Sequence, residues 1–264
     1  MTVRIPLTSA DDPRVARYRD LKNPKGAGAT FIAETNGVIA SALDCGLAPV
    51  SAIIADRFAE GRDKELIARF GDAPVYTAPE ETLSALTGYN LTRGILAEFR
   101  RPAPLPLTEE LFAPVTRIAI LENVRDASNT GSLFRSAAAL GIGLILLSAG
   151  CCDPLHRKSV RTSMGGVFRI PWVKTELGGE ALIRLVQQNG FTVNALALRE
   201  GALPLSAVRP AVKTALALGA EAEGLTDAAI AACDRAVIIP MRSGMDSLNV
   251  SVAASIAFYA LGEA

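Results

Sequence analysis

Histidine is nearly absent from this chain, which has only His156 among its 264 residues. The four cysteines, Cys45, Cys151, Cys152 and Cys233, show no CxxC spacing. Because zinc sites and Cys–His nucleophile pairs are built from clusters of these side chains, the sequence indicates neither of them. We expect the cysteines to be reduced and mostly buried residues of a cytoplasmic protein.

Long apolar runs and a surplus of charge of either sign are also missing. No run of about 18 apolar residues occurs, so a membrane span is not expected. Residues 1–6 lack the apolar core of a signal peptide. The 27 basic residues are balanced by 27 acidic ones. Since phosphate neutralisation favours a basic surface, this balance argues weakly against a nucleic-acid binder, unless local clusters override it.

Hydrophobic and charged residues occur in ordinary globular proportions, 50% and 20%. Three prolines within residues 99–106 predict a linker, because proline is excluded from helix interiors and central strands. The pattern before the linker predicts a small α/β domain. Its expected helices span residues 12–21, 38–46, 63–70 and 79–86, and its expected strands span 29–34, 50–55 and 75–77.

After the linker, apolar strands and helices alternate regularly. We expect strands at residues 117–122, 143–147, 167–173, 191–197, 213–218 and 236–239, and helices at 131–140, 180–189 and 226–232. Near-continuous apolar strands of this kind predict a parallel sheet covered by helices on both faces. Such sheets bind ligands at the carboxyl ends of their strands, here the loops that follow Leu121, Ala197, Leu218 and Ile239.

The helix that follows the last strand is apolar almost all the way round. Leu248, Val252, Ile256 and Ala260 form one stripe, and such a helix has to be covered on several sides. Polar residues nevertheless interrupt the segment, and they need hydrogen-bond partners if they are buried. These residues are Ser247, Asn249, Ser251 and Ser255.

The loop after Leu121 carries Asn129 and, six positions later, Arg135. One interpretation is that a loop residue and a residue on the next helix turns converge on one ligand. The alternative is structural: Ser128 or Asn129 caps the helix, and Arg135 is a solvated helix residue. These residues alone leave both interpretations open.

A second loop, residues 219–225, places Glu221 and Glu223 between two glycines. It is too short for a GxGxxG dinucleotide fingerprint, and its carboxylates would repel a pyrophosphate. It therefore suits a neutral or cationic ligand, unless it is only a strand-to-helix turn with solvated acids. A third loop, Gly-rich and basic, begins at Lys22 and is either a mobile connection or a phosphate-binding loop.

Three segments together, residues 121–142, 218–225 and 239–259, resemble in order and spacing the three motifs of the SpoU/TrmH branch of the SPOUT RNA methyltransferases. The most specific part is Ser247-Leu-Asn-Val-Ser-Val-Ala. Residues 153–171 are also similar to this family. More loosely, residues 1–98 resemble its N-terminal substrate-binding domain, a small α/β fold related to ribosomal proteins, although Thr35 stands where glycine is common.

The resemblance implies methylation of a ribose 2′-hydroxyl in structured RNA, with S-adenosylmethionine as cofactor. It implies an RNA substrate-binding domain at 1–98, a Pro-rich linker at 99–115 and a SPOUT methyltransferase domain at 116–264 with a trefoil-knotted parallel sheet. The extra N-terminal domain favours ribosomal over transfer RNA. In relatives the last helix packs against its copy, so we expect a homodimer through this helix and no membrane partner.

The resemblance also assigns a cofactor pocket. Gly219, Ile239 and Leu248 would line the adenine and ribose pocket, assisted by the main chain at Ala197, Leu198, Leu218 and Met241. Backbone recognition of this kind explains why few side chains in these loops indicate a cofactor.

The positions that match catalytic residues of the family are Asn129, Arg135, Glu221, Ser247 and Asn249. The family favours Arg135 as the base, but a free guanidinium stays protonated at ordinary pH. An equally physical role is to bind the adjacent phosphate and stabilise the developing alkoxide. The two asparagines would hold Arg135 or the ribose. Glu221 would orient the arginine or face the sulfonium, and Ser247 would fix the loop.

Local basic clusters would have to provide the RNA affinity. Arg157, Lys158, Arg161 and Arg169 are close in sequence beside the site motifs, and Lys22 belongs to a second basic run. A run of charged residues usually forms only a solvated face. Beside a methyltransferase site, however, RNA binding is the favoured interpretation for Arg161.

Two other classes of protein are weighed against a methyltransferase. A non-catalytic SPOUT-fold factor for RNA binding or ribosome assembly would have no reason to keep Asn129, Arg135, Glu221 and Asn249. An ordinary doubly wound nucleotide-binding enzyme would carry a glycine fingerprint after its first strand, which this chain lacks. The sequence leaves open which RNA and nucleotide are modified, and whether the role is housekeeping or antibiotic resistance.

Overall fold

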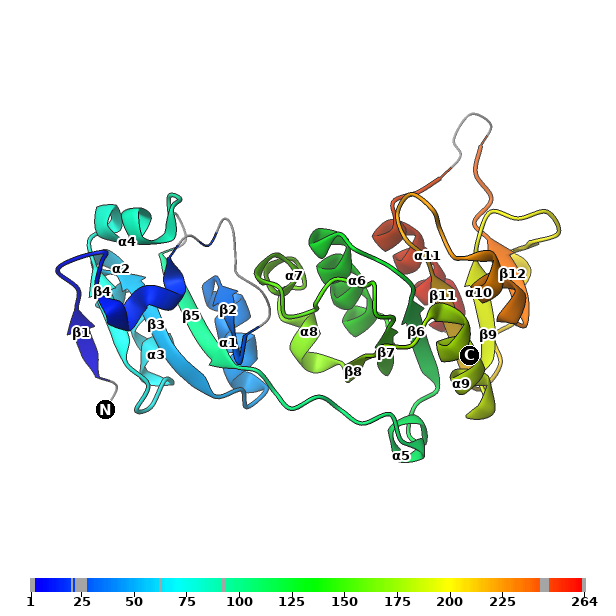
Figure 1. Ribbon diagram of the computed structural model, residues 1–264, viewed down its shortest axis with the longest axis horizontal. Helices are drawn as coiled ribbons and strands as arrows, with labels where there is room; N and C mark the ends of the chain where they lie inside the picture. Colours follow the sequence, from blue (N-terminus) through cyan, green and yellow to red (C-terminus); the bar gives the residue numbers. More distant parts are fainter. Residues whose placement is uncertain are drawn as a thin grey trace. The chain divides into compact units, whose positions relative to one another are not determined.

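The computed structural model describes residues 3–19, 21, 28–61, 63–91, 94–242 and 247–262. The chain forms two compact units (Figure 1). Unit 1 comprises Met1–Pro102 and Leu155–Gly165, and unit 2 comprises Ala103–Pro154 and Gly166–Ala264. A short segment from the second half of the sequence thus packs with the first unit, whereas the sequence predicted one continuous domain over 116–264.

Unit 1 contains a mixed five-stranded sheet in the order β1-β4-β3-β5-β2. β1, β4 and β3 are parallel, while β5 runs antiparallel to both β3 and β2. The strands are β1 (Arg4–Pro6), β2 (Thr30–Glu34), β3 (Pro49–Ala55), β4 (Val75–Ala78) and β5 (Ile95–Arg100). β5 was not predicted, and it extends into the residues interpreted as the linker.

The helices of unit 1 are short. They are η1 (Pro13–Tyr18), α1 (Asn36–Asp44), α2 (Asp56–Ala59), α3 (Lys64–Ala68), α4 (Glu80–Thr87) and α7 (Arg157–Thr162). The helix expected at 12–21 is the 3-10 helix η1, which ends where Arg19 becomes extended. One core cluster joins Val15 and Tyr18 to Ile53 and Leu96 of the sheet.

Unit 2 contains a seven-stranded parallel sheet in the order β10-β12-β9-β11-β6-β7-β8. Its strands are β6 (Arg117–Leu121), β7 (Leu144–Leu147), β8 (Trp172–Lys174), β9 (Thr192–Leu196), β10 (Leu203–Pro204), β11 (Thr214–Leu218) and β12 (Arg235–Ile238). The four strands whose carboxyl ends were predicted to bind a ligand, β12, β9, β11 and β6, are consecutive neighbours. Their loops therefore emerge at one edge of the sheet.

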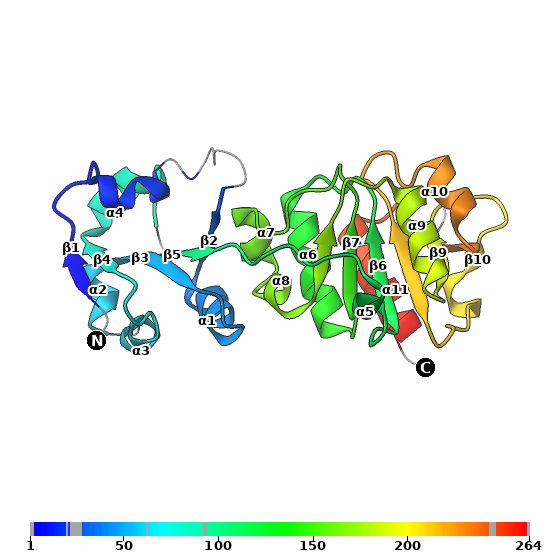
Figure 2. The same cartoon turned by 60° about the horizontal axis from the view of Figure 1, so that its bottom comes forward.

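Helices cover both faces of this sheet, as the sequence predicted (Figure 2). They are α5 (Glu109–Phe112), α6 (Ala127–Ala139), α8 (Gly166–Arg169), α9 (Gly179–Gln188), α10 (Asp227–Ala232) and α11 (Val250–Gly262), with the 3-10 turn η2 (Leu205–Ala207). α9 and α10 share a core cluster with one face, and α11 packs against α6 and β11.

The strand expected at 167–173 is wrong over most of its length. Residues 166–169 form helix α8, and strand β8 starts only at Trp172. Pro171 carries no N–H for a ladder, so it separates the two elements. Val167 and Ile170 are buried as part of a helix and turn, and hydrophobicity alone does not distinguish this case from a buried strand.

Two further expectations can be compared with the described residues. All four cysteines are free in the structure, and only Cys151 is buried, whereas most were expected to be; Cys45 is exposed. Within the described part of the chain, no helix is both long enough and apolar enough to cross a membrane.

The end of α11 is held by the buried Arg117 at the start of β6. Its Nε donates to the carbonyl of Leu261 at 2.9 Å, and its Nη1 donates to that of Val212 at 2.8 Å. Charge-assisted hydrogen bonds of this kind satisfy carbonyls that a helix end leaves open. The C-terminal helix is thereby fastened to the sheet, and its threading into a knot stays a prediction.

Candidate active site

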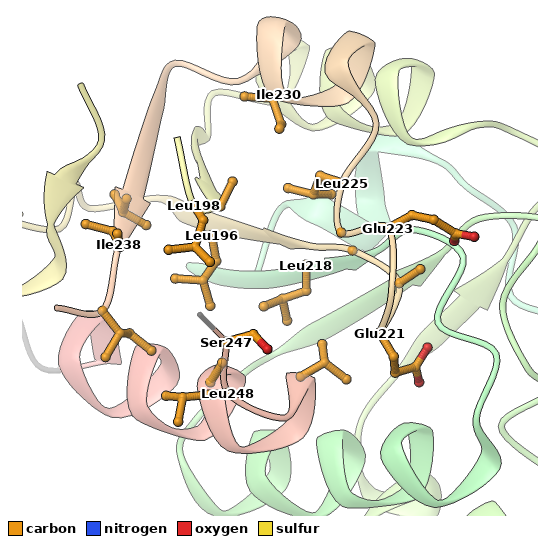
Figure 3. A pocket seen from close by; sticks show the side chains of 18 of the residues that line it. Leu196, Leu198, Leu218, Glu221, Glu223, Leu225, Ile230, Ile238, Ser247 and Leu248 are labelled. Atoms are coloured by element: carbon orange, nitrogen blue, oxygen red, sulfur yellow. The ribbon is translucent and has the colours of Figure 1, made fainter. Parts of the chain in front are cut away.

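A cavity of about 300 Å³ opens at the carboxyl ends of β9, β11 and β12, beside the start of α11 (Figure 3). Its centre is lined by aliphatic side chains, among them Leu196, Leu218 and Ile238. All seven residues predicted to hold a cofactor line this cavity: Ala197, Leu198, Leu218, Gly219, Ile239, Met241 and Leu248. Sequence reasoning missed Leu225, Ile230, Val250 and Ala253, which also line it.

Gly219 lets the loop after β11 fold back on itself. A Cβ atom there would overlap the backbone of Gly224 and Leu225. Ala220 and Gly224 exchange two backbone hydrogen bonds, both of 3.0 Å, and Gly224 has a φ of +71°. The buried Glu122 fixes the far end of the loop by accepting from Thr226 N at 2.8 Å. The loop is therefore a compact wall of the cavity.

Three of the predicted catalytic residues form one hydrogen-bond chain across three segments. Asn129 donates through Nδ2 to Glu221 Oε1 at 2.9 Å, and Asn249 Nδ2 donates to Asn129 Oδ1 at 2.9 Å. Asn249 Oδ1 in turn accepts from Ser251 N at 2.9 Å. Ser247 lines the cavity two positions before Asn249. The loop after β11, the start of α6 and the start of α11 are thus locked together.

The structural alternative, in which Ser128 or Asn129 caps α6, is wrong about the capping residue. The N-cap is Asp126, whose Oδ1 accepts from Asn129 N at 2.8 Å, and not Ser128 or Asn129. Asp126 has an extended backbone and a short acceptor side chain, as an N-cap requires. The Asn129 side chain is therefore available for Glu221 and Asn249.

Arg135 lies apart from this chain of hydrogen bonds. It is exposed on α6, and its side chain makes no hydrogen bond or ion pair to the described residues. Asn129 is already helical, so the two side chains are rotated by about 240° and separated by about 9 Å along one helix axis. Asn129 is thus a helix residue and not a loop residue, and convergence of the two side chains on one ligand stays a prediction.

The polar residues of the last helix have partners. Ser251 Oγ lies 2.7 Å from Asn249 Oδ1, and Ser255 Oγ lies 2.7 Å from Ser136 Oγ on α6. These contacts cap the helix and pin it to α6. On its other side, Val252, Ile256 and Tyr259 stay 49%, 40% and 63% exposed, and we call these three residues the α11 stripe.

The predicted RNA-binding residues are divided between the units. Arg157, Lys158 and Arg161 lie on α7 in unit 1, whereas Arg169 lies on α8 in unit 2. Lys158, Arg161 and Arg169 are exposed. Lys22 lies outside the described residues.

Arg157 is engaged in a partly buried cluster. Its Nη1 donates to Glu34 Oε2 at 2.9 Å and to the Tyr89 hydroxyl at 3.0 Å, and its guanidinium lies 5.1 Å from the centre of the Tyr89 ring. Arg161 Nη1 lies 3.7 Å from the same carboxylate. Burial, with a smaller effect of Glu34, raises the pKa of Tyr89 to about 12. Arg157 is therefore occupied within the protein.

Residues 116–259 match the model of the SpoU rRNA Methylase family. An uncharacterized tRNA/rRNA methyltransferase of Mycobacterium tuberculosis is 38% identical over 94% of this chain and 88% of its own length. A 23S rRNA (guanosine-2′-O)-methyltransferase of Bacillus subtilis is 30% identical over 70% of this chain and 71% of its own. The crystal structure of an S-adenosylmethionine-bound rRNA methyltransferase from Sinorhizobium meliloti superposes with a TM-score of 0.81 and 25% identity, covering 98% of this chain and 97% of that one.

Proposed function

We propose that this chain acts on ribosomal RNA as a homodimer. It belongs to the SpoU rRNA Methylase family and is an S-adenosylmethionine-dependent RNA 2′-O-ribose methyltransferase. The observation that carries the catalytic role is the hydrogen-bond chain from Glu221 through Asn129 to Asn249 beside the cavity. A non-catalytic assembly factor has no use for these hydrogen bonds, nor for an exposed arginine on the same helix that has no partner among the described residues.

The cavity fits the cofactor that the family uses. Its aliphatic centre suits an adenine ring, and its volume of about 300 Å³ lies in the range of small-molecule sites. Gly219 lines the cavity without a side chain, and the backbone of Gly224 and Leu225 fills the space that its Cβ atom would take. Glu221 and Glu223 lie on the loop at its rim with carboxylates pointing away from the leucines, so they favour a cation over a phosphate (Figure 3).

The predicted residues would hold the cofactor through the strand ends and the folded loop. Leu218, Ile239 and Leu248 would enclose the base, and the main chain around Ala197, Leu198 and Met241 would supply hydrogen bonds. When bound, S-adenosylmethionine supplies a methyl group that its positive sulfur already activates. The protein then has to orient the ribose and stabilise the oxygen that loses its proton.

The polar side chains at the rim of the cavity and beside it would do that second task. Glu221 holds Asn129, so we assign it to positioning the asparagine and not to facing the sulfonium. Asn129 and Asn249 would present amide groups to the ribose, and Ser247 would fix the loop before α11. Arg135, exposed and unpaired within the described residues, would bind the adjacent phosphate and stabilise the developing alkoxide.

Ribosomal RNA as the substrate is supported by the relatives that share unit 1 as well as unit 2. The Sinorhizobium rRNA methyltransferase covers nearly all of this chain. A tRNA (guanosine-2′-O)-methyltransferase of Thermus thermophilus matches only 53% of it. We therefore assign choice of target to unit 1, with Arg161 and Lys158 on α7 as RNA contacts, Arg169 as a contact from unit 2, and Lys22 and Arg157 as weaker candidates. A cytoplasmic location remains part of the proposal.

The experiment is a methyl-transfer assay with labelled S-adenosylmethionine and, separately, unmodified ribosomal and transfer RNA, followed by digestion to nucleosides. Label in a 2′-O-methyl nucleoside from ribosomal RNA is the expected result. Label from transfer RNA alone would contradict the proposed substrate. Absence of label together with absence of cofactor binding by calorimetry would favour the non-catalytic factor.

A further inference from the structure

Helix α7 belongs to unit 1, although the chain before this segment and the chain after it both belong to unit 2. The chain leaves unit 2 after Pro154 and returns to it at Gly166. Between these points, Leu155 and Val160 are buried, 3% and 0% exposed, and α7 packs against β2. Unit 1 is thus joined to unit 2 by two further peptide connections, besides the one at residues 102–103.

A buried carboxylate fastens α7 in place. The Glu34 side chain is 7% exposed at the end of β2, and a carboxylate so buried requires partners. Its partners include Arg157 and Arg161, both on α7, and Arg157 is also held by Tyr89. The next residue, Thr35, has a φ of +82°, a conformation that a β-branched residue adopts only when its surroundings impose it. We call Glu34, Tyr89 and Arg157 the α7 clasp.

The other end of α7 leads directly to the backbone beside Arg135. Met164 and Gly165, with φ of +50° and +88°, turn the chain sharply after α7. Ser163 Oγ accepts from Gly165 N at 3.3 Å and fixes this turn. A Cβ atom at Gly166 would lie 2.8 Å from the carbonyl oxygen of Phe134 and 3.1 Å from the Cα of Arg135. Gly166, the residue that follows this turn, therefore packs directly on the α6 backbone at Arg135.

We propose that the residues of the α7 clasp are positioning residues. They make α7 move with unit 1, and RNA held by unit 1 therefore sets the position of Arg135 through residues 157–166. The inference rests on the proposed roles of unit 1 in target choice and of Arg135 in methyl transfer. It assigns Arg157 to coupling the two functions, and it leaves Arg161 and Lys158 to contact RNA.

The test uses the full-length protein with Glu34→Gln, Arg157→Gln and Arg157→Lys. Arg69→Gln, which breaks an exposed ion pair with Asp44 in the same unit, is the matched control. Amide hydrogen exchange is followed over residues 157–162 and 127–139. The kcat at saturating unmodified ribosomal RNA, the KM for this RNA, the Kd for S-adenosylmethionine and the thermal midpoint are measured in parallel.

For Glu34→Gln and Arg157→Gln we expect faster exchange in α7, a kcat lowered by about 2- to 30-fold, and an unchanged cofactor Kd. Arg157→Lys, which keeps the charge, should restore part of the kcat, and Arg69→Gln should match the wild type. Faster exchange in α7 with an unchanged kcat would show that the clasp is only structural and would overturn the inference. Unchanged hydrogen exchange in α7 would show that the clasp does not hold this helix, and it would also overturn the inference. A wild-type protein inactive on both RNA classes would overturn the proposed function as well.

Discussion

Arg135 is the catalytic candidate whose surroundings say most about its role. It is exposed, and no described acid neutralises it, so its guanidinium is a free bidentate donor suited to a phosphate or an alkoxide. We expect Arg135→Ala to lower kcat by about 100- to 1000-fold, as the loss of a charge-stabilising donor typically does. Cofactor affinity should persist, because Arg135 does not line the cavity. Single-turnover kinetics and calorimetry measure both effects, and a variant with the wild-type rate would refute the assignment.

Thr35 is a residue at which the backbone carries strain. Its φ of +82° and ψ of +145° belong to a region that favours glycine. We expect Thr35→Gly to raise the free energy of unfolding by about 1 kcal/mol, the relief of strain exceeding the entropy that glycine loses. Denaturant unfolding measures it. Thr77→Gly in β4, where glycine only weakens a strand, should lower the free energy of unfolding. If this free energy falls in both variants, the backbone at Thr35 is not strained.

At the scale of elements, long apolar segments were predictable and short or polar ones were not. The strands that end at Leu121 and Leu218 were foreseen because uninterrupted β-branched and aliphatic runs have few other solutions. Helix α8 was taken for a strand because its four residues are too few to show a period. The cap of α6 was misplaced by two to three positions, since Asp126, Ser128 and Asn129 are all good N-cap residues.

The loop after β11 depends on one glycine, and this dependence can be tested. A side chain at Gly219 would overlap the backbone of Gly224 and Leu225, so Gly219→Ala must open the wall of the cavity. We expect the affinity for S-adenosylmethionine to fall at least about tenfold, or about 1.4 kcal/mol, in calorimetry. Gly178→Ala, where a Cβ atom meets nothing within 4 Å, is the control. Equal affinities of the two variants would exclude the loop from the cofactor site.

At the scale of the whole molecule, the sequence indicated two α/β parts but not how the chain is shared between them. The Pro-rich segment marked one crossing near Pro102. The two crossings around α7 carry no compositional signal, because Arg157 and Glu34 are far apart in sequence and meet only in the fold. The separation of Asn129 and Arg135 was hidden for a similar reason, since it depends on where α6 begins.

The α11 stripe gives a prediction that concerns the assembly. Val252, Ile256 and Tyr259 remain exposed on a helix whose other faces are buried, and a contiguous apolar patch of this kind marks an interaction surface. In the proposed homodimer the same stripe on a second copy covers it, as an isologous contact requires. We therefore expect a dimeric mass in light scattering, and a monomeric mass for Ile256→Glu at micromolar concentration.

The control for this prediction is Val212→Glu, which adds the same charge at an apolar residue that is 83% exposed and lies outside α11. It should stay dimeric. Because Ile256 is 40% exposed, the glutamate should leave the unit folded, and circular dichroism checks this. A monomeric wild type would refute the dimer, whereas a dimeric, folded Ile256→Glu variant would place the interface elsewhere. If Ile256→Glu is monomeric and also loses methyl transfer while binding the cofactor, the active site needs both copies, which would explain why Arg135 stands apart from Asn129 within one chain.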